Sequence, residues 1–268
     1  MKKVLFINSE MTPYLPESPV ASIGRNLPQG IQERKNEIRS FMPRYGCINE
    51  RKNQLHEVIR LSGMNIIIGD VDRPLVIKVA SIAAARMQVY FIDNEDYFKR
   101  KFVYADAEGK PFADNGERAI FFARGVLETV KKLRWAPDII HCHGWISQVL
   151  PLYLKKVYKD DPIFAGAKVV TSLYDDVPEG RFSPEFAENL LFSSVKAADI
   201  ADLKEADGIF LAHLALRYSD GVIFGAGNIP EQVRQFAGEL GIPALPYSGE
   251  RLASGAYIDD YNNFYEQL

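Results

Sequence analysis

Residues 3–42, KVLFINSEMTPYLPESPVASIGRNLPQGIQERKNEIRSFM, decide the fold. The apolar run at residues 3–8 is typical of a buried strand, and apolar residues at helical spacing follow over residues 20–35. A further apolar run at residues 38–42 ends at Pro43, which predicts a second strand and its stop. A strand, a helix and a strand in this order predict a parallel β–α–β unit.

The loop between the first strand and the helix has the position of a phosphate-binding loop without its chemistry. Such loops use glycine for close backbone approach and a helix N-terminus for the anionic charge. Between Glu10 and Ile23 there is no glycine, lysine or arginine, but there are three prolines and Glu17. The sequence therefore raises the question of whether this loop binds a nucleotide at all.

The alternation of strands and helices continues along the chain. Residues 56–82 alternate between apolar and polar side chains among Gly and Pro turn signals, which predicts β-hairpins. We expect further strands at residues 87–92, 138–142, 167–172 and 221–224, and helices at residues 112–133, 145–157, 204–218, 230–240 and 257–268. This order predicts an α/β fold: one Rossmann-like, doubly wound, mostly parallel sheet with helices on both faces and a β-hairpin insertion.

Composition excludes several classes of protein. The 268 residues are 47% hydrophobic, and 32 basic and 35 acidic residues leave a net charge of −3 with no long run of either sign. Nucleic acid is therefore not an expected partner. No apolar stretch reaches the ~20 residues of a membrane span. Cys47 and Cys142 have neither metal-site nor disulfide spacing, which favours a reducing cytoplasm and predicts no metal site.

Four stretches carry a family likeness, in this order: FMPRYGCI (41–48), VYFIDNEDYF (89–98), YADAEGKPFADNGERAIFFARGVLE (104–128) and PDIIHCHGWISQVLPLYLK (137–155). Over residues 1–224 the chain resembles the N-terminal domain of bacterial glycogen and starch synthases. The resemblance implies one half of a fold with two Rossmann-like domains. It also implies retaining transfer of glucose from ADP-glucose to the non-reducing end of an α-1,4-glucan, with no further cofactor.

The likeness fails at the loop after the first strand. There the family carries Lys-Thr-Gly-Gly-Leu, whose lysine and glycine backbone meet the diphosphate of the sugar nucleotide. This chain has Pro16, Glu17, Ser18, Pro19 and Val20. The lysine is lost, Pro19 has no N–H to donate, and Glu17 adds a carboxylate, so all three changes oppose nucleotide binding. Arg25 is the one nearby cation that could replace the lysine.

The resemblance also supplies the candidate sugar site. HCHGW (141–145) stands where the family has His-x-His-Asp-Trp, with Gly144 in place of the aspartate. The resemblance implies a sugar site of Asp114, Asn115, His141 and Trp145, with His141 as the one catalytic candidate. Two other interpretations stay open: His141 is a structural donor, and Asp114 with Glu117 forms a capping box at the start of the helix at residues 112–133.

The C-terminal part departs from the family. Leu173 and Tyr174 replace two polar residues of a Thr-x-His-Asn stretch. Residues 225–268 are a variable part of the same single domain, 1–268. Tyr257, Tyr261, Phe264 and Leu268 at helical spacing predict a docking helix that forms a natural end of the domain. PALPYSGE (243–250) is the candidate linker before that helix.

Two functional hypotheses remain, and the sequence does not decide whether the chain is an enzyme. The first is a degenerate, stand-alone domain that binds α-glucan, a maltooligosaccharide or a protein partner without transferring glucose. The second is a glucosyltransferase half that works with a separately encoded C-terminal domain. Under the first, we expect residues 14–20 to be ordered, with Leu173 or Tyr174 beneath them, in a monomer or weak dimer.

Overall fold

The computed structural model describes residues 1–201 and 206–268. Its strands are β1 (Lys3–Asn8), β2 (Glu37–Pro43), β3 (His56–Glu57), β4 (Met64–Ile68), β5 (Val71–Ile82), β6 (Met87–Asp93), β7 (Ile139–His143), β8 (Lys168–Leu173), β9 (Gly221–Phe224) and β10 (Ala244–Leu245). The sheet runs in the order β10-β9-β8-β7-β1-β2-β6-β5-β3. From β10 to β6 all neighbours are parallel, whereas β5 is antiparallel to β6 and pairs with β4 in a hairpin.

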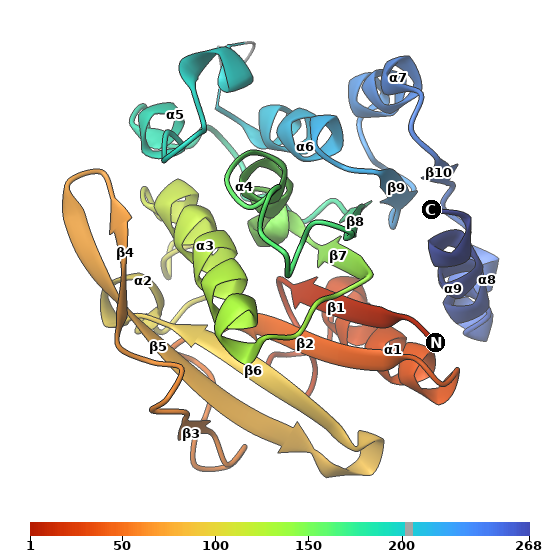
Figure 1. Ribbon diagram of the computed structural model, residues 1–268, viewed down its shortest axis with the longest axis horizontal. Coiled ribbons are helices and arrows are strands. Elements are labelled where there is room, and N and C mark those ends of the chain that lie inside the picture. Colours follow the sequence, from red (N-terminus) through yellow and green to blue (C-terminus); the bar gives the residue numbers. More distant parts are fainter. Residues whose placement is uncertain (202–205) are drawn as a thin grey trace.

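The helices cover both faces of this sheet (Figure 1). They are α1 (Pro19–Glu33), α2 (Glu95–Phe98), α3 (Asn115–Leu133), α4 (Leu150–Lys156), α5 (Phe186–Asn189), α6 (Gly208–Arg217), α7 (Glu231–Leu240), α8 (Gly249–Ser254) and α9 (Tyr257–Gln267). The predicted doubly wound, mostly parallel α/β sheet with a hairpin insertion is therefore confirmed. No helix within residues 1–201 and 206–268 is long and apolar enough to cross a bilayer.

The alternation of side chains along β1 explains why helices must cover both faces of the sheet. Leu5 and Ile7 belong to the core beneath α3, α4 and α6, whereas Val4 and Phe6 belong to the core beneath α1 and α9. Successive side chains of a strand point to opposite faces, so an apolar run at residues 4–7 is stable only in a sheet buried on both sides.

Two of the expected elements differ from the structure. The helix expected at residues 145–157 is a 3-10 turn at Trp145–Ser147 followed by α4, because Pro151 lacks an N–H and cannot continue a helix from that turn. The candidate linker at residues 243–250 is instead β10, which pairs with β9, and the start of α8. Of the helix expected at residues 204–218, residues 204 and 205 lie outside the described part.

The C-terminal helix α9 docks as expected. Tyr257, Tyr261 and Phe264 are buried, and Tyr265, which the spacing argument did not include, is buried as well. Leu268 is partly buried against the same cluster. Removing a buried aromatic side chain typically costs about 3–5 kcal/mol, so this helix is an integral part of the domain. It lies beside α1 near the N-terminus (Figure 1).

Candidate functional site

The loop after β1 is closed by its own side chains. Ser18 is the N-cap of α1: its hydroxyl accepts from Ala21 N at 3.0 Å and donates to a carboxylate oxygen of Glu10 at 2.9 Å. The Ser18 carbonyl accepts from Ser22 N at 2.9 Å. The N-terminus of α1, which attracts anions in many α/β proteins, therefore faces a carboxylate of its own chain.

The apolar part of this loop is ordered and buried, but not where it was expected. Tyr14 and Leu15 belong to the core beneath α3, and the ring of Tyr14 meets Phe91 of β6 edge-on at 4.9 Å. Of the two residues expected beneath residues 14–20, Leu173 lies in a different cluster from any residue of this loop. Tyr174 instead shares a cluster with Val20 at the start of α1. The turn at Tyr14 directs its ring toward β6 because Phe91 offers an aromatic partner there.

The remaining loop residues offer little to a diphosphate. Pro16, Glu17 and Pro19 are exposed, so the carboxylate of Glu17 is available to repel an anion. The guanidinium of Arg25, the candidate replacement cation, donates to Gln29 Oε1 at 2.6 Å. The loop therefore exposes the carboxylate of Glu17, while the nearest arginine, Arg25, is hydrogen-bonded along the surface of α1.

His141 is fully buried beneath α9. Its Nδ1 lies 2.6 Å from the Tyr265 hydroxyl, and its Nε2 lies 2.6 Å from the Ser172 hydroxyl. Burial lowers the pKa of His141 well below its usual value, and the neighbouring His143 lowers it further. Both ring nitrogens are occupied, so a sugar cannot reach this side chain. This burial and these two hydrogen bonds count against the catalytic and sugar-binding roles expected for His141 and favour its role as a structural hydrogen-bonding residue.

His143, two residues along β7, shares this face and was not among the candidates. Its Nε2 lies 2.9 Å from the carbonyl of Val20, so Nε2 donates and Nδ1 accepts from the Tyr174 hydroxyl at 3.1 Å. Burial lowers the pKa of His143 to about 4. The period of two along a strand could have indicated that both histidines face the same helices.

Asp114 occupies the N-cap position of α3, but its side chain does not cap the helix, so the predicted capping box is wrong. The carboxylate makes no cap hydrogen bond and instead forms a two-pronged ion pair with Arg100. Glu117, the other expected member, accepts from the Tyr97 hydroxyl at 2.7 Å. A guanidinium offers two charged donors in a fork, which binds a carboxylate more strongly than a single neutral backbone N–H does.

Asn115 and Trp145 come together, but inside the protein. The amide of Asn115 donates to the carbonyl of Tyr104 at 2.9 Å and accepts from Arg118 at 2.7 Å. The ring of Tyr104 meets the ring of Trp145 at 5.1 Å. Asn115 and Trp145 are 2% and 0% exposed, so neither is an open platform for a sugar. The structure therefore separates the four candidates: Asp114, Asn115 and Trp145 lie on the α3 side of the sheet, and His141 lies on the α9 side.

Asp176, in the loop after β8, is a polar residue of this region that the sequence did not single out. Its Oδ2 accepts from Trp145 N at 2.9 Å, and its Oδ1 is buried without a partner in the described residues. Burial raises the pKa of Asp176 to about 7. A side chain at Gly144 would meet this carboxylate and Ser9, since a Cβ there would lie 2.7 Å from Oδ2 and 2.4 Å from the Ser9 hydroxyl.

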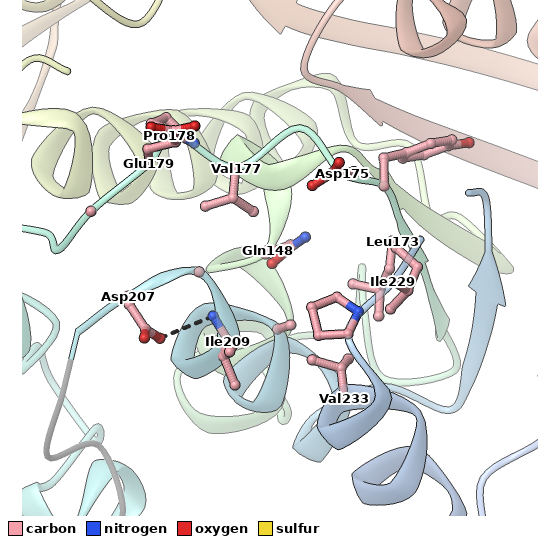
Figure 2. A pocket seen from close by; sticks show the side chains of 15 residues that line it. Gln148, Leu173, Asp175, Val177, Pro178, Glu179, Asp207, Ile209, Ile229 and Val233 are labelled. Carbon is pink, nitrogen blue, oxygen red and sulfur yellow. Dashed lines mark hydrogen bonds between the residues drawn. The ribbon is translucent and has the colours of Figure 1, made fainter. Parts of the chain in front are cut away.

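A cavity of about 250 Å³ opens at the carboxyl ends of β8 and β9. Its walls come from the loop after β8, the start of α6 and the start of α7, as Figure 2 shows. The apolar lining consists mainly of Leu173, Val177, Ile209, Ile229 and Val233. Doubly wound sheets bind their ligands at this edge.

The polar groups of the cavity are mostly acceptors. Asp175, Glu179 and Asp207 line it, and among the described residues that line it there is no lysine or arginine. Gln148 lines it as well and is 1% exposed, and its Oε1 is buried with no hydrogen-bond partner in the described residues. Asp207 is occupied as the N-cap of α6, accepting from Ile209 N at 3.0 Å (Figure 2). The cavity therefore suits a neutral ligand with hydroxyl donors better than an anion. Within the described residues, no three His, Cys, Asp or Glu side chains are placed to hold a metal ion.

The fold and this edge define a doubly wound α/β domain of the kind that binds ligands at its strand ends. A family model described as the starch synthase catalytic domain matches residues 3–242, and the chain belongs to this family. The glycogen synthase of Chlorobium luteolum is 39% identical over 197 residues, covering 73% of this chain and 40% of the relative. The glycogen synthase of Chlorobium phaeovibrioides is 34% identical over 241 residues, covering 88% and 48%.

The structural comparison agrees with the fold. The catalytic domain of starch synthase IV from Arabidopsis thaliana, bound to ADP and acarbose, matches with a TM-score of 0.69 and 15% identity. The match covers 91% of this chain and 51% of that one. The chain thus spans about half the length of the proteins it matches. The resemblance seen in the sequence is confirmed at the level of the family.

Proposed function

We propose that this domain binds α-glucan at the carboxyl ends of β8 and β9 and does not transfer glucose on its own. It would act in glycogen metabolism in the cytoplasm, in keeping with its two free cysteines, Cys47 and Cys142. The observation that carries the proposal is the hydrogen bond between Ser18 and Glu10 at 2.9 Å, which puts a carboxylate at the α1 N-terminus.

A glucosyl transferase must stabilise the diphosphate that leaves the sugar, and prearranged cations and N–H donors usually do so. In this loop Pro19 has no N–H, the Ala21 N–H is bonded to Ser18, and Arg25 is bonded to Gln29. Negative charge on Glu10 adds repulsion. The contacts of this loop therefore support the proposal that the chain does not transfer glucose on its own.

We place glucan binding in the cavity beside β8 and β9 and not at the candidate sugar-binding residues named from the sequence. Asn115, His141 and Trp145 are buried, which counts against their direct role. Glucose hydroxyls are donors as well as acceptors, and the cavity offers the free Oε1 of Gln148 together with carboxylates and apolar walls. The structural neighbour that was solved with acarbose supports an oligosaccharide as the ligand class.

The decisive experiment follows labelled glucose from ADP-glucose into glycogen with the purified chain. We expect no incorporation above a no-protein control. A second candidate function is a glucosyltransferase half completed by a separate C-terminal domain, which is supported by the match to 40–48% of the length of full glycogen synthases. Incorporation that appears only when the C-terminal half of such a relative is added would favour this second function.

A further inference from the structure

A second concavity, of about 560 Å³, lies at the opposite edge of the sheet from the β8 and β9 cavity. Arg39 and Gln88, near the amino ends of β2 and β6, line it together with Tyr90. Lys132 from the last turn of α3 and Arg60 from the segment between β3 and β4 complete the polar lining. Among the described residues that line it, every charged group is cationic, in contrast to the acidic cavity beside β8 and β9.

In the described part of the chain, no carboxylate lies within ion-pair distance of Arg39, Arg60 or Lys132. Glu37, two residues before Arg39, accepts from Trp135 Nε1 at 2.5 Å and does not line this concavity. Three like charges around one hollow repel one another, and an anion bound between them would relieve that repulsion.

Arg39 is held in place as a preformed donor. Its guanidinium lies over the rings of Trp135 and Tyr90, at 5.2 and 5.8 Å, and its Nη1 donates to the Tyr90 hydroxyl at 2.8 Å. Its Nε is buried and has no partner in residues 1–201 and 206–268. An arginine fixed by stacking loses little side-chain entropy on binding, and its fork matches two oxygens of a phosphate.

A neighbouring concavity of about 260 Å³ shares Arg39, Gln88 and Tyr90, but Glu37 lines it beside Arg86. The hollow that suits an anion is therefore the one between Arg39, Arg60 and Lys132. We propose that this edge is a second ligand site, which binds a phosphate group, free or as the monoester of a small molecule. This site is separate from the carboxyl ends of β8 and β9, where we propose that glucan binds. A failure to bind phosphate here would therefore leave the proposed function unchanged.

The test is calorimetric titration of the purified chain, in low-salt buffer, with inorganic phosphate and with glucose 1-phosphate, and with glucose as the uncharged control. We expect saturable heat with phosphate or its ester and none with glucose. Tighter binding of the ester identifies a phosphorylated small molecule as the ligand, and equal binding identifies the free anion. No saturable heat from either anion at 10 times the protein concentration and above, up to roughly 10 mM, overturns the proposal.

Variants locate the binding. Arg60→Ala removes an exposed cation of the site, and Arg51→Ala removes an exposed cation of the segment between β2 and β3 that does not line it. We expect affinity to fall about tenfold for Arg60→Ala and to stay within about twofold for Arg51→Ala. Gln88→Glu places a carboxylate among the cations without emptying the core, and it should abolish the heat. Equal effects of the two arginine variants, or full binding by Gln88→Glu, would contradict the site.

Discussion

The imidazole of His141 and the hydroxyl of Tyr265, 124 positions apart in the chain, lie 2.6 Å from each other in the core. This contact joins the middle of β7 to the C-terminal helix α9. A residue that the family likeness offered for sugar chemistry is therefore a hydrogen-bonding residue of the core. Its second nitrogen meets Ser172, so the ring has no free position for a ligand.

Replacing Tyr265 with phenylalanine tests the structural role of this pair. Tyr265→Phe keeps the ring and leaves His141 Nδ1 unpaired, and an unsatisfied buried polar group costs about 1–3 kcal/mol. We expect the free energy of unfolding in urea to fall by about this amount. Tyr247→Phe is the control, because Tyr247 is 42% exposed and its loss should change stability by less than about 0.5 kcal/mol. Equal stability of the two variants would disprove the role.

Asp176 makes stability depend on pH. Burial raises its pKa to about 7 in the folded chain, above the usual value of 3.8. The folded state therefore holds this proton more tightly, and its contribution to stability is lost as the pH rises through 7. Asp176→Asn removes the titration and keeps the acceptor for Trp145 N. We expect the variant to gain stability relative to the wild type between pH 5 and pH 8, measured by urea unfolding at both.

His141 and His143 do not disturb this comparison. Burial lowers the pKa of both, so their contribution to stability falls as the pH drops below the usual histidine value. Both proteins in the comparison keep these histidines, and their contribution cancels in the difference. The same difference in stability at pH 5 and pH 8 would show that Asp176 does not titrate in this range.

Restoring the family's loop should restore affinity for ADP. The variant carries Pro16→Lys, Glu17→Thr, Ser18→Gly and Pro19→Gly, which bring back a cation and backbone N–H donors. A charge-assisted bond contributes about 1.5–3 kcal/mol, so we expect affinity for ADP to rise at least about tenfold, measured by calorimetry. Ser18→Gly alone is the control: it loses the cap of α1 without adding a cation. A restored loop that binds ADP no better than this control would show that the loop is not what prevents binding.

Glucan binding should depend on Gln148. Gln148→Met keeps most of the side-chain volume but removes the free Oε1 from the cavity beside β8 and β9. We expect chemical-shift changes on adding millimolar maltopentaose to the wild type and at least about fivefold weaker binding in the variant. Gln235→Met, at an exposed position of α7, is the control and should bind as the wild type does. Unchanged binding of maltopentaose by Gln148→Met would show that glucan does not bind in this cavity.

The sequence predicted the fold well because the signals are local. An apolar run such as residues 4–7 is enough to indicate a strand buried on both faces, and helical spacing indicates α3 and α9. Prediction from the sequence failed where groups distant in the chain compete to bind one side chain. Asp114 had the right spacing for a cap, but Arg100 takes its carboxylate. No local pattern reveals such a choice, because it is made by tertiary contacts.

The candidate site was harder to predict for the same reason. The order of residues places His141 near a strand end, where ligands bind, but only the fold shows that α9 covers it. The loop after β1 was different, since its missing lysine and added Glu17 are visible in the sequence itself. The chemistry of that loop could therefore be predicted, whereas the direction in which Tyr14 packs could not.

Titration of the wild-type chain with ADP-glucose tests the central claim most directly. The claim is that the carboxylate of Glu10, hydrogen-bonded to Ser18, lies at the α1 N-terminus, where a diphosphate would need a cation. We predict no saturable binding of ADP-glucose below about 1 mM, the concentration that corresponds to a binding free energy of roughly −4 kcal/mol. Saturable one-to-one binding with a dissociation constant well below that concentration would contradict the claim.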